Sequence, residues 1–483
     1  MFKLTTFFCA LAVLPATLTG YQFAPTAVNA YPETPTKPAA NTVYRQAPRA
    51  DIVYQQGTPT AVAPHSGSPQ LFVAPETATS PTGEMVGEPV FAMEPEYYES
   101  NFNATDIIQI NSYYTRRMLD VLNRQTDKQL LVLDNEWESG SPSLIIGGQM
   151  RASFLAASTN RANKFPYQGR FPSNFSGTTA TDARILQANL GATAHVNSLT
   201  HGYGELLFSD VFTFPAFNQG SFQVRQAYIV IGDRNRSPFY GFIGKKNVSF
   251  GDMRTLNPFS QSMVWHYFNA LAEGIGGGYQ SGNFHWSITG INGGRGIRVA
   301  DSPQRGRINN FASNGTFCLC DGPTRKFEIG AGYLHGTIYD ALEPDHIEPD
   351  IFGARNPAWD INTRLRYDSW QFSGEFASTV NPWPATKSRV NAWRAETAVN
   401  IWAWGLPAAL SAGWSEGNQG PAGSQYEFNR QFVLGLGVSP NINTQLSLEY
   451  VLSSGFAPLR NITTSSDRNV QQHSAVLGLV LVL

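Results

Sequence analysis

Charged residues are scarce in this chain of 483 residues, since Asp, Glu, Lys and Arg together make up 14% of it. A soluble protein usually carries about 25% charged residues. Beyond the first thirty residues there is no run of about 18 apolar residues, which excludes membrane-spanning helices. The net charge of −2 offers no basic surface, which argues against nucleic acid as a partner.

Cysteine is also rare, with three residues in the whole chain. Cys9 lies in the apolar stretch at the N-terminus, and Cys318 and Cys320 form a Cys-Leu-Cys sequence in a stretch rich in Gly and Asn. In an oxidising compartment these two thiols could form a disulfide across one residue. We therefore predict a disulfide-stapled external loop. Without a nearby His, the pair makes a poor metal site.

Catalytic motifs are missing as well. The chain has no Gly-x-Ser-x-Gly elbow, and Gly276–Gly278 is followed by no predicted helix, so it is not a phosphate-binding loop. One group of His and acidic residues fits no metal-ligand spacing and is interpreted as a solvated external loop. That group is His335, Asp340, Asp345, His346 and Glu348. We predict no enzyme, no cofactor and no resident metal.

Aromatic residues, in contrast, are abundant at 12%, and the chain contains 44 Gly. Low charge, many aromatics and many glycines without a helical span are typical of a membrane β-barrel, with an apolar outside and a polar lumen. A soluble β-sandwich or a secreted β-rich enzyme is the alternative that composition alone leaves open.

The first thirty residues have the features of a secretory signal peptide. Lys3 gives a positive start, the stretch from Leu4 to Leu18 is mostly apolar, and Val28 and Ala30 form a small-residue end. Residues 31–100 are rich in Pro, Ala, Thr and Glu and show no apolar period, so we predict a disordered periplasmic segment.

Residues 101–142 are predicted to hold one short helix, capped by Asn103 or Thr105. Arg116 and Arg117 lie opposite its apolar face. That face comprises Ile107, Ile110, Tyr114, Met118, Val121 and Leu122.

From Ser143 onward the apolar period becomes two, which indicates strands with one apolar face. In residues 182–197, for example, apolar side chains such as Leu190 alternate with polar ones such as Asn189. The phase shifts at Asp368-Ser369, which predicts a short turn there. We therefore predict an all-β fold, a transmembrane antiparallel β-barrel over residues 143–483.

At about 20 residues for each strand with its connection, this region supports roughly 14 to 18 strands, with sixteen as the central estimate. A barrel of that size leaves an aqueous channel, and it is too small for a TonB-dependent receptor of about 22 strands. Long connections are expected outside the cell. They are residues 159–181, 251–269, 293–325, 340–358 and 417–429.

Three short motifs point to a family. Residues 222–232 read FQVRQAYIVIG, residues 237–246 read SPFYGFIGKK, and residues 250–252 read FGD. Together with the GYGELLF strand of residues 202–208, they resemble the LbtU-like siderophore porin family of outer membranes, over roughly residues 143–300. The resemblance implies a TonB-independent pore that takes iron-loaded siderophore across the outer membrane.

A wide pore selects solutes by the charges along its wall. A basic track would draw in anionic ferric-siderophore complexes or other anions, whereas a mutually neutralising wall would only keep the lumen wet. The predicted lumen-facing residues are Arg151, Arg225, Lys245, Lys246, Arg364, Arg366, Arg394, Glu205, Glu375, Glu396 and Glu449.

The sequence thus leads to a siderophore porin of the bacterial outer membrane, with the lipid bilayer and a small-molecule solute as its partners. A general or phosphate-type anion porin is the second hypothesis, and a structural or adhesive surface barrel is the third. The sequence leaves the oligomeric state open.

Overall fold

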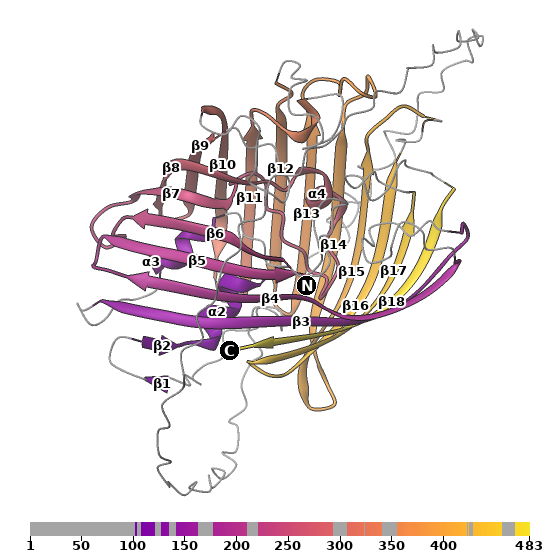
Figure 1. The fold of residues 1–483 in the computed structure, drawn as a ribbon, viewed down its shortest axis with the longest axis horizontal. Helices are drawn as coiled ribbons and strands as arrows, with labels where there is room; N and C mark the ends of the chain where they lie inside the picture. Colours follow the sequence, from indigo (N-terminus) through magenta and orange to yellow (C-terminus); the bar gives the residue numbers. More distant parts are fainter. Residues whose placement is uncertain are drawn as a thin grey trace, which may run out of the picture. The chain divides into compact units, whose positions relative to one another are not determined.

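The computed structural model describes residues 102–103, 108–120, 127–134, 142–162, 177–209, 221–292, 307–322, 324–340, 355–422, 424, 428–455 and 469–483. Its sixteen long strands, β3 to β18, form one antiparallel ring in chain order (Figure 1). The ring closes because β18 pairs with β3 along its whole length. The predicted antiparallel barrel of about sixteen strands is therefore confirmed. The predicted segments 1–30 and 31–100 lie outside the described residues.

The barrel strands have these bounds: β3 (Ser143–Thr159), β4 (Thr179–His195), β5 (Thr200–Ser209), β6 (Ser221–Ile231), β7 (Phe239–Asn247), β8 (Leu271–Ser281), β9 (Phe284–Asn292), β10 (Ile308–Asp321), β11 (Arg325–Leu334), β12 (Ala358–Tyr367), β13 (Trp370–Thr379), β14 (Asn391–Ala403), β15 (Leu406–Asn418), β16 (Asn429–Asn441), β17 (Thr444–Ser454) and β18 (Gln471–Val482). Two short strands, β1 (Phe102–Asn103) and β2 (Ile108–Ile110), join this sheet, and β2 runs parallel to β3.

Three helices and one 3-10 turn complete the described elements: α2 (Ser112–Leu119), α3 (Gln129–Asp134), α4 (Met263–Phe268) and η1 (Ile338–Asp340). No helix in the described part of the chain is long and apolar enough to cross a membrane. The predicted helix begins later than expected, because Asn111 is its cap and residues 108–110 form β2. Tyr114 and Met118 lie on its buried face, as predicted.

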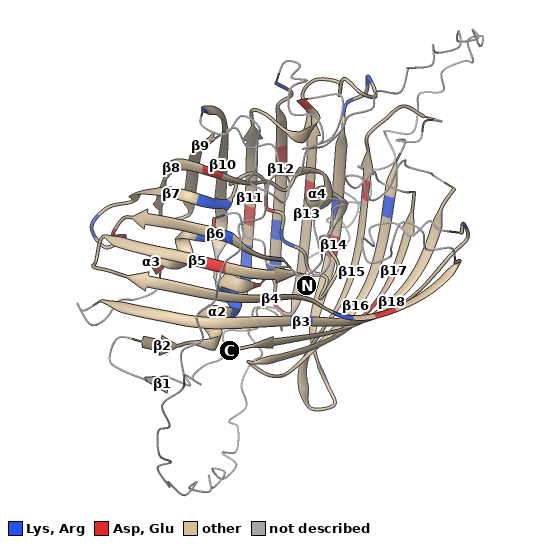
Figure 2. Ribbon diagram, viewed as in Figure 1, with Lys and Arg blue, Asp and Glu red and all other residues tan. Residues whose placement is uncertain are grey.

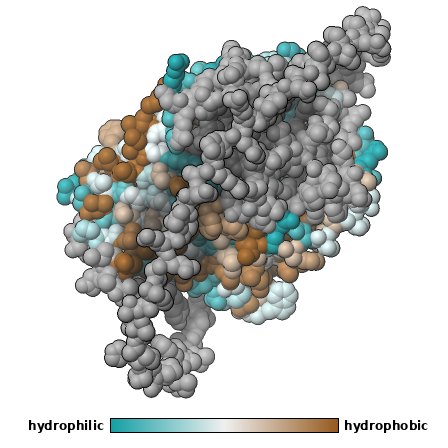
Figure 3. Space-filling model, in the orientation of Figure 1, coloured by the Kyte–Doolittle hydropathy of each residue, from teal (hydrophilic) through white to brown (hydrophobic). Residues whose placement is uncertain are grey.

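The two-residue alternation separates the two faces of the wall. On β17, Leu446 and Leu448 are exposed on the outside, whereas Ser447 and Glu449 are buried on the inside. The same alternation holds on β12, where Trp359 and Ile361 point outward. Figure 3 shows hydrophobic residues gathered over the part of that surface where β4 to β8 lie in Figure 1.

Aromatic side chains lie at two levels of the outer face. Trp359 and Tyr367 both point outward from β12 and are eight residues apart, which is about 26 Å along a strand. This separation agrees with an apolar band of about 25 Å flanked by two aromatic girdles.

The turns at one end of the barrel are short. The predicted turn at Asp368-Ser369 joins β12 to β13, and Asp368 has a φ of 50°. Trp404 and Gly405 join β14 to β15, both with positive φ, as in a two-residue hairpin turn that suits the twist of the strands. We call this the short-turn end.

Two predictions about external loops are wrong. Residues 308–321 form β10, so Cys318 and Cys320 lie in a strand near the short-turn end and not in an external loop. Neither cysteine forms a disulfide in the structure, and the Cys318 thiol donates a hydrogen bond to the carbonyl oxygen of Cys320. A register shift between them keeps the strand paired through both residues. The second wrong prediction concerns residues 251–269, which fold into the lumen.

The outer face gives a direct prediction. Leu434→Arg places a charge on the outer face of β16, and we expect it to lower the free energy of unfolding by about 2 to 4 kcal/mol if this position lies near the bilayer midplane. Asn362→Arg, at a partly buried polar position on the inner face of β12, is the control and should change it much less. Denaturant unfolding in lipid vesicles measures both. Equal losses would contradict the assignment of the two faces.

Candidate functional site

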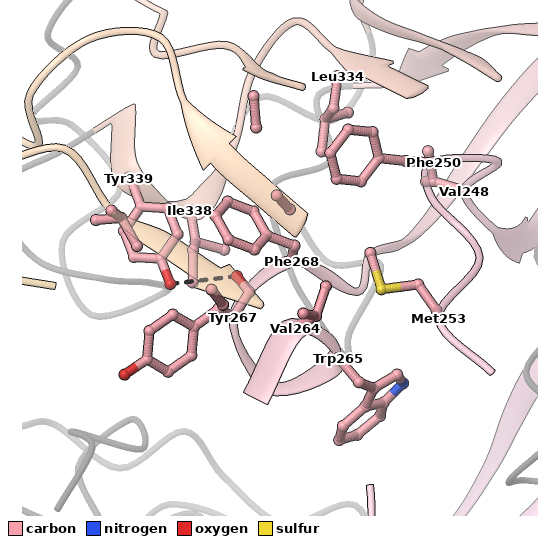
Figure 4. Packing of buried hydrophobic residues seen from close by; sticks show 14 of the residues in the cluster. Val248, Phe250, Met253, Val264, Trp265, Tyr267, Phe268, Leu334, Ile338 and Tyr339 are labelled. Atoms are coloured by element: carbon pink, nitrogen blue, oxygen red, sulfur yellow. Dashed lines mark hydrogen bonds between the residues drawn. The ribbon is translucent and has the colours of Figure 1, made fainter. Parts of the chain in front are cut away.

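The lumen is narrowed by residues 248–270, which connect β7 to β8 and which we call the inner loop. Its helix α4 contacts β13, β14, β15 and β16. The predicted external position was wrong because this segment carries a row of large apolar side chains that pack against the inner wall (Figure 4).

Aromatic rings of the inner loop pack against small residues of the wall. Ala312, Ala358, Ala377 and Ala392, on β10, β12, β13 and β14, are fully buried in this cluster. A chain of ring contacts runs from Phe268 to Tyr339 and then to Trp383, with centroid separations of 5.8 and 5.4 Å. The Tyr339 hydroxyl donates to the carbonyl oxygen of Tyr267 at 3.2 Å (Figure 4).

Glutamates on the wall bind the backbone of the inner loop. Glu375 Oε1 accepts from the amides of Asp252 and Met253 at 2.8 and 3.1 Å. Glu396 Oε2 accepts from the amide of Leu256 at 2.8 Å.

Further along the loop, Glu449 accepts from the amides of Phe259 and Ser260 at 2.6 and 3.0 Å. Because an ionised carboxylate forms stronger hydrogen bonds than a neutral acceptor, these contacts fix the path of the loop across β13, β14 and β17.

The positive charge of Arg394 offsets the negative charges of Glu375 and Glu396. Its guanidinium donates to Glu375 at 2.6 Å, to Glu396 at 2.9 Å and to Asp252 at 2.9 Å, and its side chain has no exposed area. One wall residue on β14 therefore joins two wall carboxylates to one carboxylate of the inner loop. Figure 2 shows charged residues on β11 to β16.

Two glycines let the loop lie directly on the wall. A Cβ added at Gly435 on β16 would lie 2.5 Å from Pro258 Cδ, and one at Gly478 on β18 would lie 2.5 Å from the ring of Phe259. Beyond them Arg151 on β3 donates to the Phe259 carbonyl at 2.6 Å and lies over its ring. The loop therefore follows the inner wall from β9 round to β3.

Arg254 and Arg364 keep part of their charge facing the lumen. Their side chains are 20% and 22% exposed, and they share Asp252 with Arg394. The contact from Arg364 Nη2 to Asp252 Oδ2 is long, at 3.8 Å, and Arg364 Nε is buried with no hydrogen-bond partner among the described residues. All three guanidinium groups contact Asp252, and Arg254 Nη2 also lies 3.5 Å from Glu328 Oε2, so cations and carboxylates alternate at this part of the lumen.

A second insertion comes from the N-terminal side of the barrel. The inserted N-terminal segment, defined as residues 108–120 and 127–134, packs Tyr114, Met118 and Leu131 against the inner wall of β3 to β7. Lys128 Nζ donates to the carbonyl oxygens of Met118 and Asp120 at 2.5 and 3.1 Å. This contact places a cation at the negative end of α2.

The predicted site residues fall into separate groups. Arg364, Arg394, Glu375 and Glu396 lie together around the inner loop, and Arg151 and Glu449 hold its far end. Each of these has the partners described above. Their role in solute selection stays a prediction.

The remaining predicted residues lie elsewhere. Arg225 Nε approaches Glu205 Oε1 at 3.7 Å on β5 and β6. Lys246 is buried and donates to Ser249 at 3.1 Å, and Arg366 donates to the Gly322 carbonyl at 3.0 Å. Lys245 is the exception: it alternates with buried Lys246 and shares the face of exposed Ile243, so it lies on the outer face and not in the lumen.

Sequence reasoning missed Asp252, Arg254 and Asp127, three charged residues that the structure places inside the lumen. All three lie outside strands, where no alternation assigns a face. The FGD motif at residues 250–252 was a signal for Asp252, since it follows β7 directly and supplies the first turn of the inner loop, where Gly251 has a φ of 68°. Within the described residues, no group of three His, Cys, Asp or Glu could hold a metal ion.

No protein-family model matches the chain, and no curated protein matches it. Membership of the LbtU-like siderophore porin family therefore stays a hypothesis.

Among solved structures, the outer-membrane channel DcaP of Acinetobacter baumannii is 11% identical, with a TM-score of 0.47 over 71% of this chain and 98% of that one. OmpF of Salmonella typhi, in complex with daunomycin, is 12% identical, with a TM-score of 0.47 over 71% and 98%. An anion-selective porin from Comamonas acidovorans is 11% identical, with a TM-score of 0.46 over 71% and 100%. Likenesses of this degree carry no information on the solute.

Arg394→Met tests the anchoring of the inner loop. It removes the compensating charge and leaves three carboxylates close together, which should lower the free energy of unfolding by about 3 to 5 kcal/mol. Arg430→Met, whose ion pair with Glu416 is partly exposed, is the control and should have an effect of about 1 kcal/mol or less. Denaturant unfolding of both variants measures the difference, and equal effects would contradict the anchor.

The anchor also predicts a pH dependence. Burial would raise the pKa of Asp252, but Arg254, Arg364 and Arg394 hold it well below its usual value. A depressed pKa stabilises the fold fully above the unfolded-state pKa, about 3.9, and this stabilisation is lost as the pH falls toward the folded-state value. Asp252→Asn should therefore destabilise the protein at pH 7 and differ progressively less from wild type below about pH 4. Thermal unfolding of both proteins across pH checks this, and a constant difference would contradict it.

Proposed function

We propose that this chain is a porin of the bacterial outer membrane, a channel rather than an enzyme, with the short-turn end and the N-terminal segment on the periplasmic side. The observation that supports this best is the closed barrel whose polar bore is narrowed by a loop bound to its own wall. A loop fixed in this way sets the size and charge of what passes, as expected of a selective pore.

The solute class that the lumen supports is a small anion. The side chains of Arg254 and Arg364 are partly exposed to the lumen, at 20% and 22%, and a guanidinium binds carboxylates and phosphates through paired hydrogen bonds. The ferric-siderophore hypothesis adds to this the resemblance of residues 202–252 to siderophore porins. A general anion porin would use the same two arginines without the iron complex.

Anion preference is tested by the reversal potential of the purified protein in planar bilayers under a salt gradient. Wild type should prefer chloride over potassium, and Arg254→Gln with Arg364→Gln should shift the reversal potential toward cation preference. Arg430→Gln, on the outer face, is the matched control and should leave it unchanged. An unshifted double variant would contradict the proposed role of these arginines.

Uptake and conductance measurements distinguish the ferric siderophore from a general anion as the solute. A deletion strain should take up ⁵⁵Fe-siderophore more slowly than its complemented counterpart, and the complex should reduce the current in bilayers. Conductance that is indifferent to the siderophore but blocked by phosphate would favour the general anion porin. A bilayer that carries no current at all would favour the adhesive barrel.

A further inference from the structure

Five polar side chains lie together on the inner wall of β3 and β4. Gln149 lies opposite Asn189 in the register of the two strands, and Arg151 lies opposite Gln187. Ser153 is the next inward-facing residue of β3. All five residues are buried, with 5 to 7% of their surface exposed. We call this group the β3–β4 polar patch.

The patch lies between the places where the two insertions touch this wall. On one side, α2 approaches β4 so closely that a Cβ added at Gly191 would lie 3.0 Å from Leu119 Cδ2. On the other side, Arg151 Nη2 donates to the carbonyl oxygen of Phe259 in the inner loop at 2.6 Å. Asn189 lies on β4 between Gly191 and the level of Arg151. Figure 1 shows α2 beside β3 and β4.

Each member of the patch has a buried polar atom with no hydrogen-bond partner in the described part of the chain. A buried polar atom that stays unpaired destabilises a protein, and nearly all such atoms are paired with protein or with ordered water. Five of them on two adjacent strands indicate that water or a solute in the lumen supplies their partners. The five atoms are Gln149 Oε1, Arg151 Nε, Ser153 Oγ, Gln187 Nε2 and Asn189 Oδ1.

The neighbouring carboxylate on β5 is satisfied, in contrast to the patch. Glu205 accepts from Asn189 Nδ2, from Gln226 Nε2 at 3.0 Å and from the Tyr203 hydroxyl at 3.4 Å. Because an ionised carboxylate only accepts hydrogen bonds, this contact fixes the amide nitrogen of Asn189 on the side of Glu205. The amide oxygen of Asn189 is therefore an acceptor of the patch.

The patch presents both donors and acceptors. The Arg151 guanidinium donates and the Asn189 oxygen accepts, so both kinds are present whichever way the amides of Gln149 and Gln187 are turned. An inorganic anion only accepts hydrogen bonds, and an ammonium group only donates them. A hydroxyl group does both, and several hydroxyl groups on one molecule match a patch of this kind.

We propose that the β3–β4 polar patch is a binding subsite for a polyhydroxylated solute, a sugar or a polyol, inside the lumen. The inference rests on the proposed channel function and adds a second class of solute to it. In the closed ring of sixteen strands, β4 and β12 are eight strands apart, so the patch lies on the wall opposite Arg364. Hydroxyl binding and anion selection therefore use different walls and can be varied independently.

Block of the ion current by glucose tests the subsite in the full-length protein. In planar bilayers, glucose should reduce the conductance of the wild type with a saturable concentration dependence. Tetraethylene glycol, which is similar in mass and bears hydroxyl groups only at its two ends, should reduce it without saturation. Gln149→Leu with Gln187→Leu keeps the approximate size of both side chains and removes their hydrogen bonds. This double variant should raise the half-blocking concentration of glucose by about tenfold or more, the effect of two lost hydrogen bonds.

Gln371→Leu is the matched control, because Gln371 is a buried, inward-facing glutamine on β13, away from the patch. It should leave the half-blocking concentration unchanged. Heat-modified migration in SDS gels shows which variants fold. Ser153→Ala, the smallest change in the patch, should raise the half-blocking concentration severalfold and serves if the double variant does not fold. The reversal potential should be the same in all these variants, since Arg254 and Arg364 are intact.

Equal half-blocking concentrations in the wild type and the patch variants would overturn the subsite, and so would glucose that acts no differently from tetraethylene glycol. Water would then be the partner of these atoms. If the wild type carries no current, the proposed channel function fails instead. Calorimetric titration of glucose into the detergent-solubilised protein then compares the wild type with the double variant, and equal or absent heats of binding would overturn the subsite as well.

Discussion

The structure depends on one constraint: a ring of hydrogen-bonded strands in which alternate side chains face opposite environments. Inside a bilayer every backbone N–H and C=O group must find a partner within the protein, and a closed ring satisfies this condition because it has no edge. The pairing of β18 with β3 completes that ring. All later features follow from it, since the inward half of each strand becomes the wall of a bore that polar insertions can occupy.

The bore is occupied in two different ways. The inner loop is held by glutamates that accept its backbone amides and by Arg394, which compensates them, so its anchors are buried charges on the wall. The N-terminal segment is held by an apolar patch and by several polar contacts, among them those of Asp127 and Arg116. Both insertions are therefore bound to the inner wall, and both narrow the bore.

The strands could be read from the sequence because their pattern is local. Leu446, Leu448 and Tyr450 alternate with polar residues, and such a period of two fixes both the strand and its outward face. The same rule correctly placed the turn at Asp368-Ser369. It failed at Lys245, where two adjacent lysines must face opposite sides and the sequence does not say which faces the lumen.

The position of the two insertions could not be predicted from a local pattern, because the residues that bind them are far away in the chain. In the sequence, residues 251–269 look like an external loop. Their position in the lumen is set by Glu375, Glu396 and Glu449, which lie on strands more than a hundred residues later in the chain. Cys318 and Cys320 were assigned to a loop because the surrounding Gly and Asn suggested turns, whereas pairing with β9 and β11 holds them in a strand.

The central claim is that one face of each strand meets lipid and the other meets water. Single cysteines at Lys326 and Ile329, inward and outward on β11, test it most directly in a background without Cys318 and Cys320. With intact outer membranes and a membrane-impermeant thiol reagent small enough to enter a pore, the cysteine at position 326 should be labelled and that at position 329 should not. Equal labelling of both, or labelling of position 329 alone, would contradict the account.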